Sequence, residues 1–340
     1  MPLTLRDLGE RAITRNILPK YTRGIGDDCA AITLAGQVII ATTDPVPEPA
    51  AKVIGGDADL YWMGWLLVII NASDLSAAGA DPLGFLSALE CPPDLEVASF
   101  QRLLEGIRDA CDVEGLPYIG GNLREAGTVT GVGTAIGIIN GAEGLTRSGA
   151  SPGDLLISVG AGGRFWRDAL LVREQHEAVD KGISPLFRPR SQLRAMAALH
   201  KEDVIVAAMD NSDGLLPTLA QLAEANKCRA NLFTECLNVE GADRVGVDPI
   251  RLWLGWGDWN VIAVVSETKF ETATEMAERN DFEIRQIGIL EVGSPEVIMT
   301  GRDGRRSVAP RLESERFARD SWFTAGIDGY IRLLKTIHVG

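Results

Sequence analysis

The sequence predicts a two-domain α/β (α+β) protein, on three observations. The chain of 340 residues is long enough for two domains, each with a core of its own. Runs typical of strands alternate with segments typical of helices, and each half carries aspartates at strand ends beside glycine-rich turns. Ser, Gly and Pro gather in LTRSGASPGD, residues 145–154, which indicates a junction near residue 145. We therefore expect domains over 1–144 and 145–310, followed by a tail over 311–340.

In the first half, hydrophobic spacing and turn residues define the elements in order. Apolar residues recur at helical spacing in two segments, and β-branched residues form the intervening runs. The expected elements are a helix over 4–18, a strand over 37–43, a central helix within 63–82, a strand over 83–89, a helix over 95–111, a short strand over 116–119 and a strand over 129–139.

The central helix carries polar residues on an otherwise apolar stretch, MGWLLVIINASDLSAAGADP. Asn71 and Asp74 are three residues apart and share a face, and Gly79 provides the stop. An unpaired buried charge is costly, so Asp74 needs a partner, and a metal ion would be one. The simpler alternative is that Asp74 caps or hydrogen-bonds a nearby loop.

In the second half, a strand over 204–209 delivers Asp210, Asn211, Ser212 and Asp213 at its end, immediately before a helix. An aspartate at a helix N-terminus is favourable in its own right, which is the structural alternative for Asp213. The other expected elements are strands over 155–159 and 261–265 and helices over 169–179, 191–200, 215–225 and 327–337.

The acidic residues suggest the chemistry. Asp27 and Asp28 follow a glycine turn, and Asp44 ends a strand, although a hydrated turn would also explain the first two. The five cysteines and three histidines have no zinc-ligand spacing, and oxygen-only ligands suit Mg²⁺, which usually partners phosphates. Glycine pairs and arginines could contact the phosphates, yet no Walker A or protein-kinase signature occurs. The candidate phosphate contacts are Gly120, Gly121, Arg124, Arg147 and Arg188.

Composition excludes some classes of partner. Asp and Glu outnumber Lys and Arg by 47 to 33, which gives a net charge of −14 and argues against a nucleic-acid surface. The scattered cysteines read as reduced thiols of a cytoplasmic protein. The longest apolar run, 65–70 with its flanks, is shorter than a bilayer span requires, so no membrane is expected.

Six motifs in order resemble thiamine-monophosphate kinase, a member of the superfamily of aminoimidazole-ribonucleotide synthetase and selenophosphate synthetase. The resemblance covers roughly residues 5–300, and the order and spacing of the motifs make it specific. The motifs are Gly24–Ala30 (GIGDDCA), Thr42-Thr43-Asp44, Asn71-x-Ser73-Asp74-Leu75 with Gly79-Ala80-Asp81-Pro82, Ile119-Gly120-Gly121, residues 145–154, and Asp210-x-Ser212-Asp213-Gly214-Leu215.

The resemblance implies a fold and a set of roles. It implies that the N-terminal sheets of two subunits pair into a barrel across a homodimer, where ATP binds through several Mg²⁺ ions. It gives the first domain the nucleotide and metal site and the dimer contact. The implied metal positions are Asp27, Asp28, Asp44, Asp74, Asp210, Ser212 and Asp213, with Asp210 and Asp213 as catalytic residues. The implied nucleotide contacts are Gly120, Gly121, Asn122, Arg147 and Asn71.

The sequence departs from the kinase on the acceptor side. The family's GGDT is Gly120-Gly121-Asn122-Leu123 here, so one metal carboxylate is an amide. The family's GGEDYEL is residues 255–261, GWGDWNV, which lacks both glutamates. The His-Phe that follows the second acidic motif in the kinase is absent, and residues 45–51 stand there instead. We expect the nucleotide half to be retained and the acceptor half to be changed.

Three tryptophans recur every three residues where the acceptor segment lies. Trp253 is expected in the core, whereas Trp256 and Trp259 flank Asp258 in a turn and could stack on the acceptor. The alternative is that these rings also fill the core. Asp258, Trp256 and Trp259 are therefore the candidate substrate residues.

Three functions remain open on the sequence. The first is ATP- and Mg²⁺-dependent phosphoryl transfer to a small-molecule acceptor, which needs mainly positioning and charge neutralisation. The second is ATP-dependent activation of a carbonyl on another small metabolite, as in the synthetases. The third is a catalytically idle nucleotide-binding dimer. Gly131, Gly133 and Gly137 punctuate a strand and predict a subunit interface there.

Overall fold

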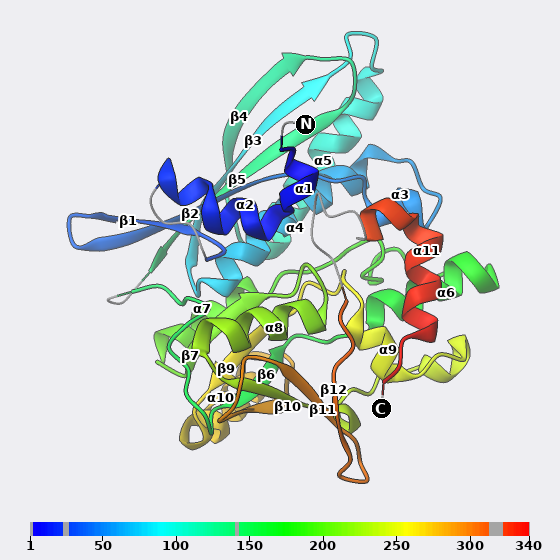
Figure 1. Cartoon of the computed structure of the whole chain (residues 1–340). Coiled ribbons are helices and arrows are strands. Elements are labelled where there is room, and N and C mark those ends of the chain that lie inside the picture. The colour runs from blue at the N-terminus through cyan, green and yellow to red at the C-terminus, as the bar shows by residue number, and fades with distance from the viewer. Residues whose placement is uncertain (1–2, 23–26, 140–142, 313–321, 340) are drawn as a thin grey trace.

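The computed structural model contains two sheets, one in each half of the chain (Figure 1). It describes residues 3–22, 27–139, 143–312 and 322–339, without the side chains of 322–325. Gly24, Ile25 and Gly26 of the first acidic motif lie outside the described residues. The sheets divide between residues 139 and 155, and the expected domain boundary at 145 falls in this interval and stays a prediction.

The first sheet has five strands in the order β1-β2-β5-β3-β4 and is open on its own. All pairs are antiparallel except β3 with β4, which is parallel. The strands are β1 (Ala30–Leu34), β2 (Gln37–Pro45), β3 (Asp81–Cys91), β4 (Tyr118–Glu125) and β5 (Thr130–Ile139).

Helix α4 (Leu60–Ala77) lies on one face of this sheet and is buried along nearly its whole length. The Asp59 side chain caps it by accepting from the Tyr61 N–H at 2.9 Å, and Gly79, at φ 68°, follows its end as expected. The preceding short helix is α3 (Ala50–Val53), and α5 (Val97–Glu114) packs beside α4.

Glycines bring α4 close to its neighbours. A Cβ on Gly64 would lie 2.1 Å from the Leu103 carbonyl oxygen, and a Cβ on Gly106 would lie 2.0 Å from that of Tyr61. The backbones of α4 and α5 therefore touch, which leaves no room for larger residues at these two positions.

Gly131, Gly133 and Gly137 lie on the face of β5 that packs against α4, and the subunit interface expected at this strand stays a prediction. Their absent Cβ atoms would meet Leu67 and Leu89, Asn71 and Phe85, and Ala80 and Leu75 respectively. The glycines of β5 thus let α4 and the neighbouring strand pack on this face within one subunit. Their spacing follows from packing inside the chain and gives no information on a subunit interface.

The second sheet has seven strands in the order β12-β11-β8-β10-β6-β9-β7. The helices of this half, which include one that ends the chain, pack around it (Figure 1). The strands are β6 (Leu155–Val159), β7 (Ile205–Asp210), β8 (Arg229–Phe233), β9 (Val261–Val265), β10 (Ile284–Glu291), β11 (Val297–Thr300) and β12 (Arg306–Val308). The helices are α6 (Arg164–Gln175), α7 (Leu193–Lys201), α8 (Leu215–Asn226), α9 (Pro249–Leu254), α10 (Phe270–Asn280) and α11 (Trp322–Thr336).

Three expected elements differ in the structure. The single helix expected over 4–18 is divided into α1 (Leu5–Leu8) and α2 (Glu10–Asn16), because Gly9 between them has φ 77°. The short strand expected over 116–119 is β4, which begins at Tyr118 and continues through Gly120 and Gly121 at the edge of the sheet. The helix expected over 169–179 begins earlier, at Arg164, where the distant Asp258 caps it.

Helix α4 also contacts β7 and β9 of the second sheet, so it lies between the two halves. Among the described residues it is the one helix long and apolar enough to cross a membrane, at 18 residues, and 94% of it is buried. The apolar run was expected to be too short to span a bilayer, whereas the helix that contains it is long enough. Its burial is that of a core helix of a folded domain.

Candidate active site

Aspartates from both halves of the chain meet where α4 lies between the two sheets. Asp44 lies next to the last residue of β2, Asp74 lies in the last turn of α4, Asp210 ends β7, and Asp28 precedes β1. Burial raises the pKa of Asp74 well above its usual value, and the negative charges of Asp210, Asp44 and Asp28 raise it further. The expected acidic residues are therefore close enough to act on one another electrostatically.

Asp74 is fixed by a hydrogen bond across the interface of α4 and β2. The Thr42 hydroxyl donates to Asp74 Oδ2 at 2.6 Å. Asp74 and Thr42 belong to two of the motifs found in the sequence, and this contact explains why they occur together. The loop-capping alternative for Asp74 does not describe what the side chain does.

Asp210 faces Asp74 from the second half. Burial raises its pKa to about 8, and the charges of Asp28 and Asp213 add to this, while a hydrogen bond from Ser212 opposes it. The Ser73 hydroxyl of α4 lies 3.5 Å from Asp210 Oδ2. Asp213 and Ser212 thus act on the same carboxyl group, as their shared motif predicted.

Arg147, in the segment between the sheets, binds both N-terminal aspartates. Its backbone N–H donates to Asp27 Oδ1 at 3.0 Å, and its guanidinium forms an ion pair with Asp28. Burial raises the pKa of Asp28, and the adjacent guanidinium lowers it in part. Arg147 Nη1 also donates to Gln221 of α8 at 2.9 Å. Arg147 therefore compensates only part of the acidic charge.

Asn71 supports the end of β2. Its Oδ1 accepts from the Asp44 N–H at 3.1 Å, and its Nδ2 donates to the Leu67 carbonyl at 2.9 Å. Gly133 lies opposite Asp44, and a Cβ there would come within 2.3 Å of Asn71 Nδ2. In the described structure Asn71 orients the Asp44 backbone, and a nucleotide contact for this residue stays a prediction.

Cys29 was not expected at the site. It is half-buried next to Asp28, and burial together with the charges of Asp74, Asp28, Asp210 and Asp44 raises the pKa of its thiol. Its place directly after the Asp-Asp pair was the available signal, but the scattered cysteines gave no ligand spacing.

No metal cage is preformed. Within residues 3–22, 27–139, 143–312 and 322–339, no group of three or more His, Cys, Asp or Glu side chains converges closely enough to hold one ion. The aspartates are near enough to influence one another's pKa, but their carboxylate oxygens do not converge on one position. This arrangement suits a cation that takes one or two carboxylates and completes its shell with water and phosphate oxygens.

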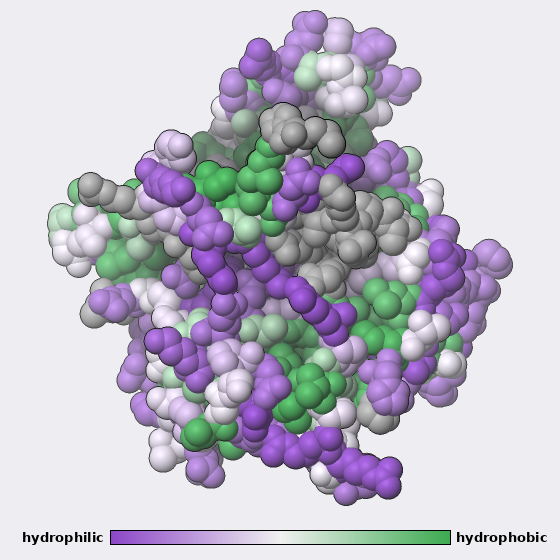
Figure 2. Space-filling model, in the orientation of Figure 1, coloured by the Kyte–Doolittle hydropathy of each residue, from purple (hydrophilic) through white to green (hydrophobic). Residues whose placement is uncertain are grey.

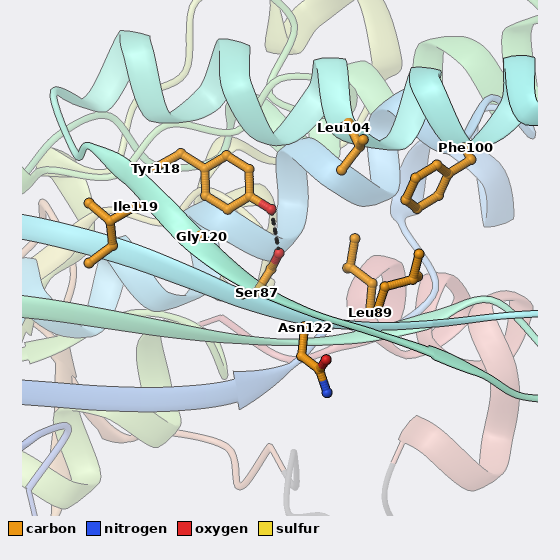
Figure 3. A pocket seen from close by; sticks show the side chains of 10 residues that line it. Ser87, Leu89, Phe100, Leu104, Tyr118, Ile119, Gly120 and Asn122 are labelled. Carbon is orange, nitrogen blue, oxygen red and sulfur yellow. Dashed lines mark hydrogen bonds between the residues drawn. The ribbon is translucent and has the colours of Figure 1, made fainter.

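A groove of about 690 Å³ lies between α5 and the edge of the first sheet (Figure 3). Phe100 and Leu104 of α5 face Leu89 across it, and the Tyr118 hydroxyl lies 2.8 Å from that of Ser87. Gly120 and Gly121 line it, whereas the Asn122 side chain points away from α5, toward the other face of the sheet.

The groove is aligned with the acidic residues. Asp44 pairs with Gly133, Gly133 with Ser87, and Ser87 with Gly121, so these four residues form one row across the sheet. Three strand spacings separate the ends of the row, about 14 Å at about 4.8 Å each. Between its ends the row is covered by α4, because Asn71 packs on Gly133 and Ser87 is buried.

A second cavity, of about 480 Å³, borders Asp27 and Arg147. Arg15 of α2 and Glu224 of α8, which are ion-paired at 2.6 Å, also line it. Two of the arginines considered for phosphates lie elsewhere. Arg188 packs over the Trp65 ring at 4.7 Å, and Arg124 is exposed at the end of β4.

The residues expected to bind the acceptor have structural contacts. Asp258 is buried and accepts from the backbone N–H groups of Gly163 and Phe165, at 2.6 and 2.8 Å, at the start of α6. Burial raises its pKa to about 7. Trp253 is in the core, as expected.

Trp256 packs in an aromatic cluster with Phe165, Trp166 and Tyr330, at ring-centroid distances of 5.1 to 6.0 Å. Trp259 is half-buried and has φ 55°. For Trp256 the core-filling alternative thus accounts for most of the ring, and an acceptor role for the three residues stays a prediction.

Comparisons with known proteins agree with this architecture. The AIR synthase related protein, N-terminal domain, matches residues 26–139, and the C-terminal domain of the same family matches residues 151–300. The chain therefore belongs to the AIR synthase related family, and within it to the group that resembles thiamine-monophosphate kinase.

Curated relatives specify that group. The chain is 30% identical to the thiamine-monophosphate kinase of Escherichia coli K12 over 66% of this chain and 70% of the relative. It is 29% identical to that of Halobacterium salinarum, over 87% and 93%. Among solved structures, AaThiL complexed with AMPPCP and TMP shares the fold, with a TM-score of 0.77 and 24% identity over 92% of this chain and 98% of that one.

Proposed function

We propose that the chain transfers the terminal phosphoryl group of ATP to a small-molecule acceptor, with Mg²⁺ at the aspartates between the two sheets. Membership of the family described above makes it a kinase-type ATP-dependent phosphotransferase. The observation that carries the magnesium proposal is the mutual effect of the buried aspartates: burial raises the pKa of Asp74 and of Asp210, and the charges of Asp28 and Asp44 add to this at Asp74. A divalent cation would relieve this repulsion.

The donor set fits magnesium. The proposed ligands offer carboxylate and hydroxyl oxygens, and Arg147 supplies positive charge on the side of Asp28. Bound Mg²⁺ would neutralise charge on the phosphates during transfer. The proposed ligands are Asp27, Asp28, Asp44, Asp74, Asp210, Ser212 and Asp213.

We place the base of the nucleotide in the groove at the edge of the first sheet and its phosphates toward the aspartates, outside the part of the row that α4 covers. The apolar side chains of Phe100, Leu104 and Leu89 would cover the base, and Gly120 and Gly121 would let the backbone approach closely. The phosphates would then point toward Asp44 and Asp74. The Asn122 side chain faces the other side of the sheet, so a contact of this residue with a base in the groove would come from its backbone.

The chain's own residues would orient the reactants. Thr42 and Ser73 direct the Asp74 and Asp210 carboxylates, and Asn71 fixes the backbone at Asp44. Asp210 and Asp213, the proposed catalytic residues, lie at the entry to α8, where a carboxylate can align an acceptor group or receive its proton. Positioning of this kind accounts for most of the catalysis in phosphoryl transfer.

The acceptor side supports a substrate other than thiamine monophosphate. The segment 255–261 carries Gly257 and Asn260 in place of two glutamates, and Asp258 is occupied by the α6 backbone. Less negative charge is then available for a cationic thiazolium ring. We therefore propose that thiamine monophosphate is turned over poorly.

Product analysis tests both parts of the proposal. ATP, Mg²⁺ and thiamine monophosphate are incubated with the protein, and ADP and thiamine diphosphate are quantified separately. We expect Mg²⁺-dependent ATP binding and a kcat/KM for thiamine monophosphate well below about 10⁴ M⁻¹s⁻¹, the low end of the usual enzyme range. Efficient formation of thiamine diphosphate would contradict the altered acceptor specificity, and equal ATP affinity in EDTA would contradict the metal site.

A further inference from the structure

Two buried asparagines adjoin the acidic turn and have no part in the proposed chemistry. Asn211 follows Asp210 at the end of β7, and Asn260 directly precedes β9. Their exposed fractions are 1% and 0%. A buried amide costs free energy unless it is hydrogen-bonded, so its contacts show what it does.

Two hydrogen bonds join the asparagines to each other. β7 and β9 are paired with Asp210 opposite Val261, so Asn211 and Asn260 lie one step beyond the ladder. The Asn211 N–H donates to the Asn260 carbonyl at 3.0 Å, and Asn211 Nδ2 donates to Asn260 Oδ1 at 2.9 Å. One bond is formed by the backbones and the other by the side chains.

The pair is anchored at both ends. Asn260 Nδ2 donates to the Ser158 hydroxyl of β6 at 2.7 Å, and that hydroxyl donates to the Gly160 carbonyl at 2.8 Å. The Thr218 hydroxyl of α8 donates to Asn211 Oδ1 at 3.1 Å. A continuous line of hydrogen bonds thus runs from β6 through the two asparagines to α8.

The turn that Asn211 occupies is under electrostatic stress. Asp210 precedes it, Ser212 and Asp213 follow it, and the charges of Asp28 and Asp213 act on Asp210. When these carboxyl groups are ionised and no cation is bound, like charges would push this turn away from α4. An uncharged, fully hydrogen-bonded network can resist that force without adding to the charge, and its strength is increased by burial.

We propose that Asn211 and Asn260 are positioning residues that hold the Asp210–Asp213 turn in its binding geometry before nucleotide and cation arrive. This positioning role rests on the proposed function, because it assumes that the Asp210–Asp213 turn binds the cation. The hydrogen-bonded pair of Asn211 and Asn260, which we call the clamp, is a feature of the fold and does not depend on the reaction. Loss of either asparagine leaves the strands paired but frees the carboxylates to move apart, which lowers affinity because the turn must then be ordered on binding.

Hydrogen–deuterium exchange of the full chain in EDTA tests the clamp directly. The variants are Asn260→Ala, the milder Ser158→Ala, which removes only the far anchor, and a control, Asn231→Ala. Asn231 is a buried amide of β8, bonded to Glu291 and Thr300 at 2.8 and 2.6 Å, three strands away from β9 in the order of the sheet. We expect faster exchange over residues 210–214 in the first two variants and not in the control.

ATP affinity with saturating Mg²⁺, measured by calorimetry on the same proteins, tests the role of the clamp. We expect roughly a 10–100-fold loss for Asn260→Ala, the scale found for outer partners of metal sites, a smaller loss for Ser158→Ala and none for Asn231→Ala. Unchanged exchange over 210–214, or unchanged ATP affinity despite faster exchange, would overturn the proposal. Failure of the unmodified protein to bind ATP would instead overturn the proposed function, and the exchange result would still decide whether the clamp exists.

Discussion

Asp74 shows how stability and binding conflict at a single residue. It is buried near three other carboxylates, so its negative charge destabilises the metal-free fold, while the Thr42 hydroxyl offsets part of that cost. Asparagine has nearly the same shape and can still accept the Thr42 hydrogen bond. A single substitution can therefore separate the two effects.

We predict that Asp74→Asn weakens ATP binding in Mg²⁺ by about 10–100-fold, the scale for disturbing a metal site, and leaves the metal-free protein at least as stable. Calorimetry with ATP and thermal unfolding in EDTA measure the two effects. A variant that binds ATP normally, or one that unfolds at a clearly lower temperature than the parent, would refute the placement of the cation at Asp74.

Asp210 gives a pH dependence whose sign follows from its pKa. Its folded pKa is raised from 3.8 to about 8, so between these values the folded state binds more protons than the unfolded state. The free energy of unfolding should therefore fall as pH rises through this window in EDTA, and be highest toward its acidic end. Asp210→Asn should flatten the slope, whereas Glu275→Gln on the exposed face of α10 should leave it unchanged. Thermal unfolding from pH 5 to pH 8.5 checks this prediction. If stability increases with pH in this range, or if its decrease is unchanged in Asp210→Asn, groups other than Asp210 determine the pH dependence.

At the level of elements, the contact of α4 with α5 depends on two missing side chains. A Cβ atom added to Gly64 or to Gly106 would lie about 2 Å from a carbonyl oxygen of the opposite helix. Any side chain there would force the helices apart, and α4 carries Asn71, Ser73 and Asp74 toward β2 and β7. Helix packing and site geometry are therefore coupled.

We predict that Gly106→Ala lowers the free energy of unfolding by about 1–3 kcal/mol, the usual cost of overpacking a core. Gly127→Ala is the matched control, because nothing lies within 4 Å of its built Cβ and its φ is not positive. Urea denaturation measures both, and the control should remain within about 0.5 kcal/mol of the parent. Equal stability of Gly106→Ala and the control would mean that the two helices can separate without cost.

The sequence predicted most elements but not their contacts, for reasons visible in particular residues. Strands β2 to β7 and β9, helix α4 and the aspartate positions follow from periodicity and motifs, whereas β1, β8, β10, β11 and β12 were not predicted. The contacts of Asp258 could not be predicted, because its partners, the N–H groups of Gly163 and Phe165, lie over 90 residues away in the chain. The strand expected over 116–119 was too short, because a glycine pair is more typical of a turn than of a strand, and yet Gly120 and Gly121 lie within β4. Cys29 was missed because only the fold brings Asp44, Asp74 and Asp210 around it.

On the scale of the whole molecule, one face of the first sheet carries exposed hydrophobic residues. Ile32 and Leu34 of β1 are 61% and 66% exposed, and Val132 of β5 is 41% exposed. The strand registers put them on the face opposite α4. In Figure 2, hydrophobic residues gather over the five-stranded sheet, beside the mainly hydrophilic α2. An apolar sheet face of this kind favours association.

We predict a homodimer formed through this face. Light scattering at micromolar concentration should give twice the monomer mass of 36.5 kDa. Ile32→Asp with Val132→Asp should shift the protein toward monomer, because burying two charges would oppose association, and Ile183→Asp, also on an exposed residue but in the second half, should not. A monomeric parent protein would rule out the interface and any site shared across it.

The burial of α4 has a consequence for the chain before it folds. An unfolded or newly made chain presents an 18-residue apolar segment that resembles a membrane span in length and composition. An aspartate at the centre of an inserted helix costs about 2.5–3.5 kcal/mol, and less toward the ends, so Asp74 with Asn71 lowers the tendency of this segment to enter lipid. Variants that replace these residues with leucine should then partition into membranes more readily during synthesis, so the polar residues of the site also help to keep the nascent chain in water.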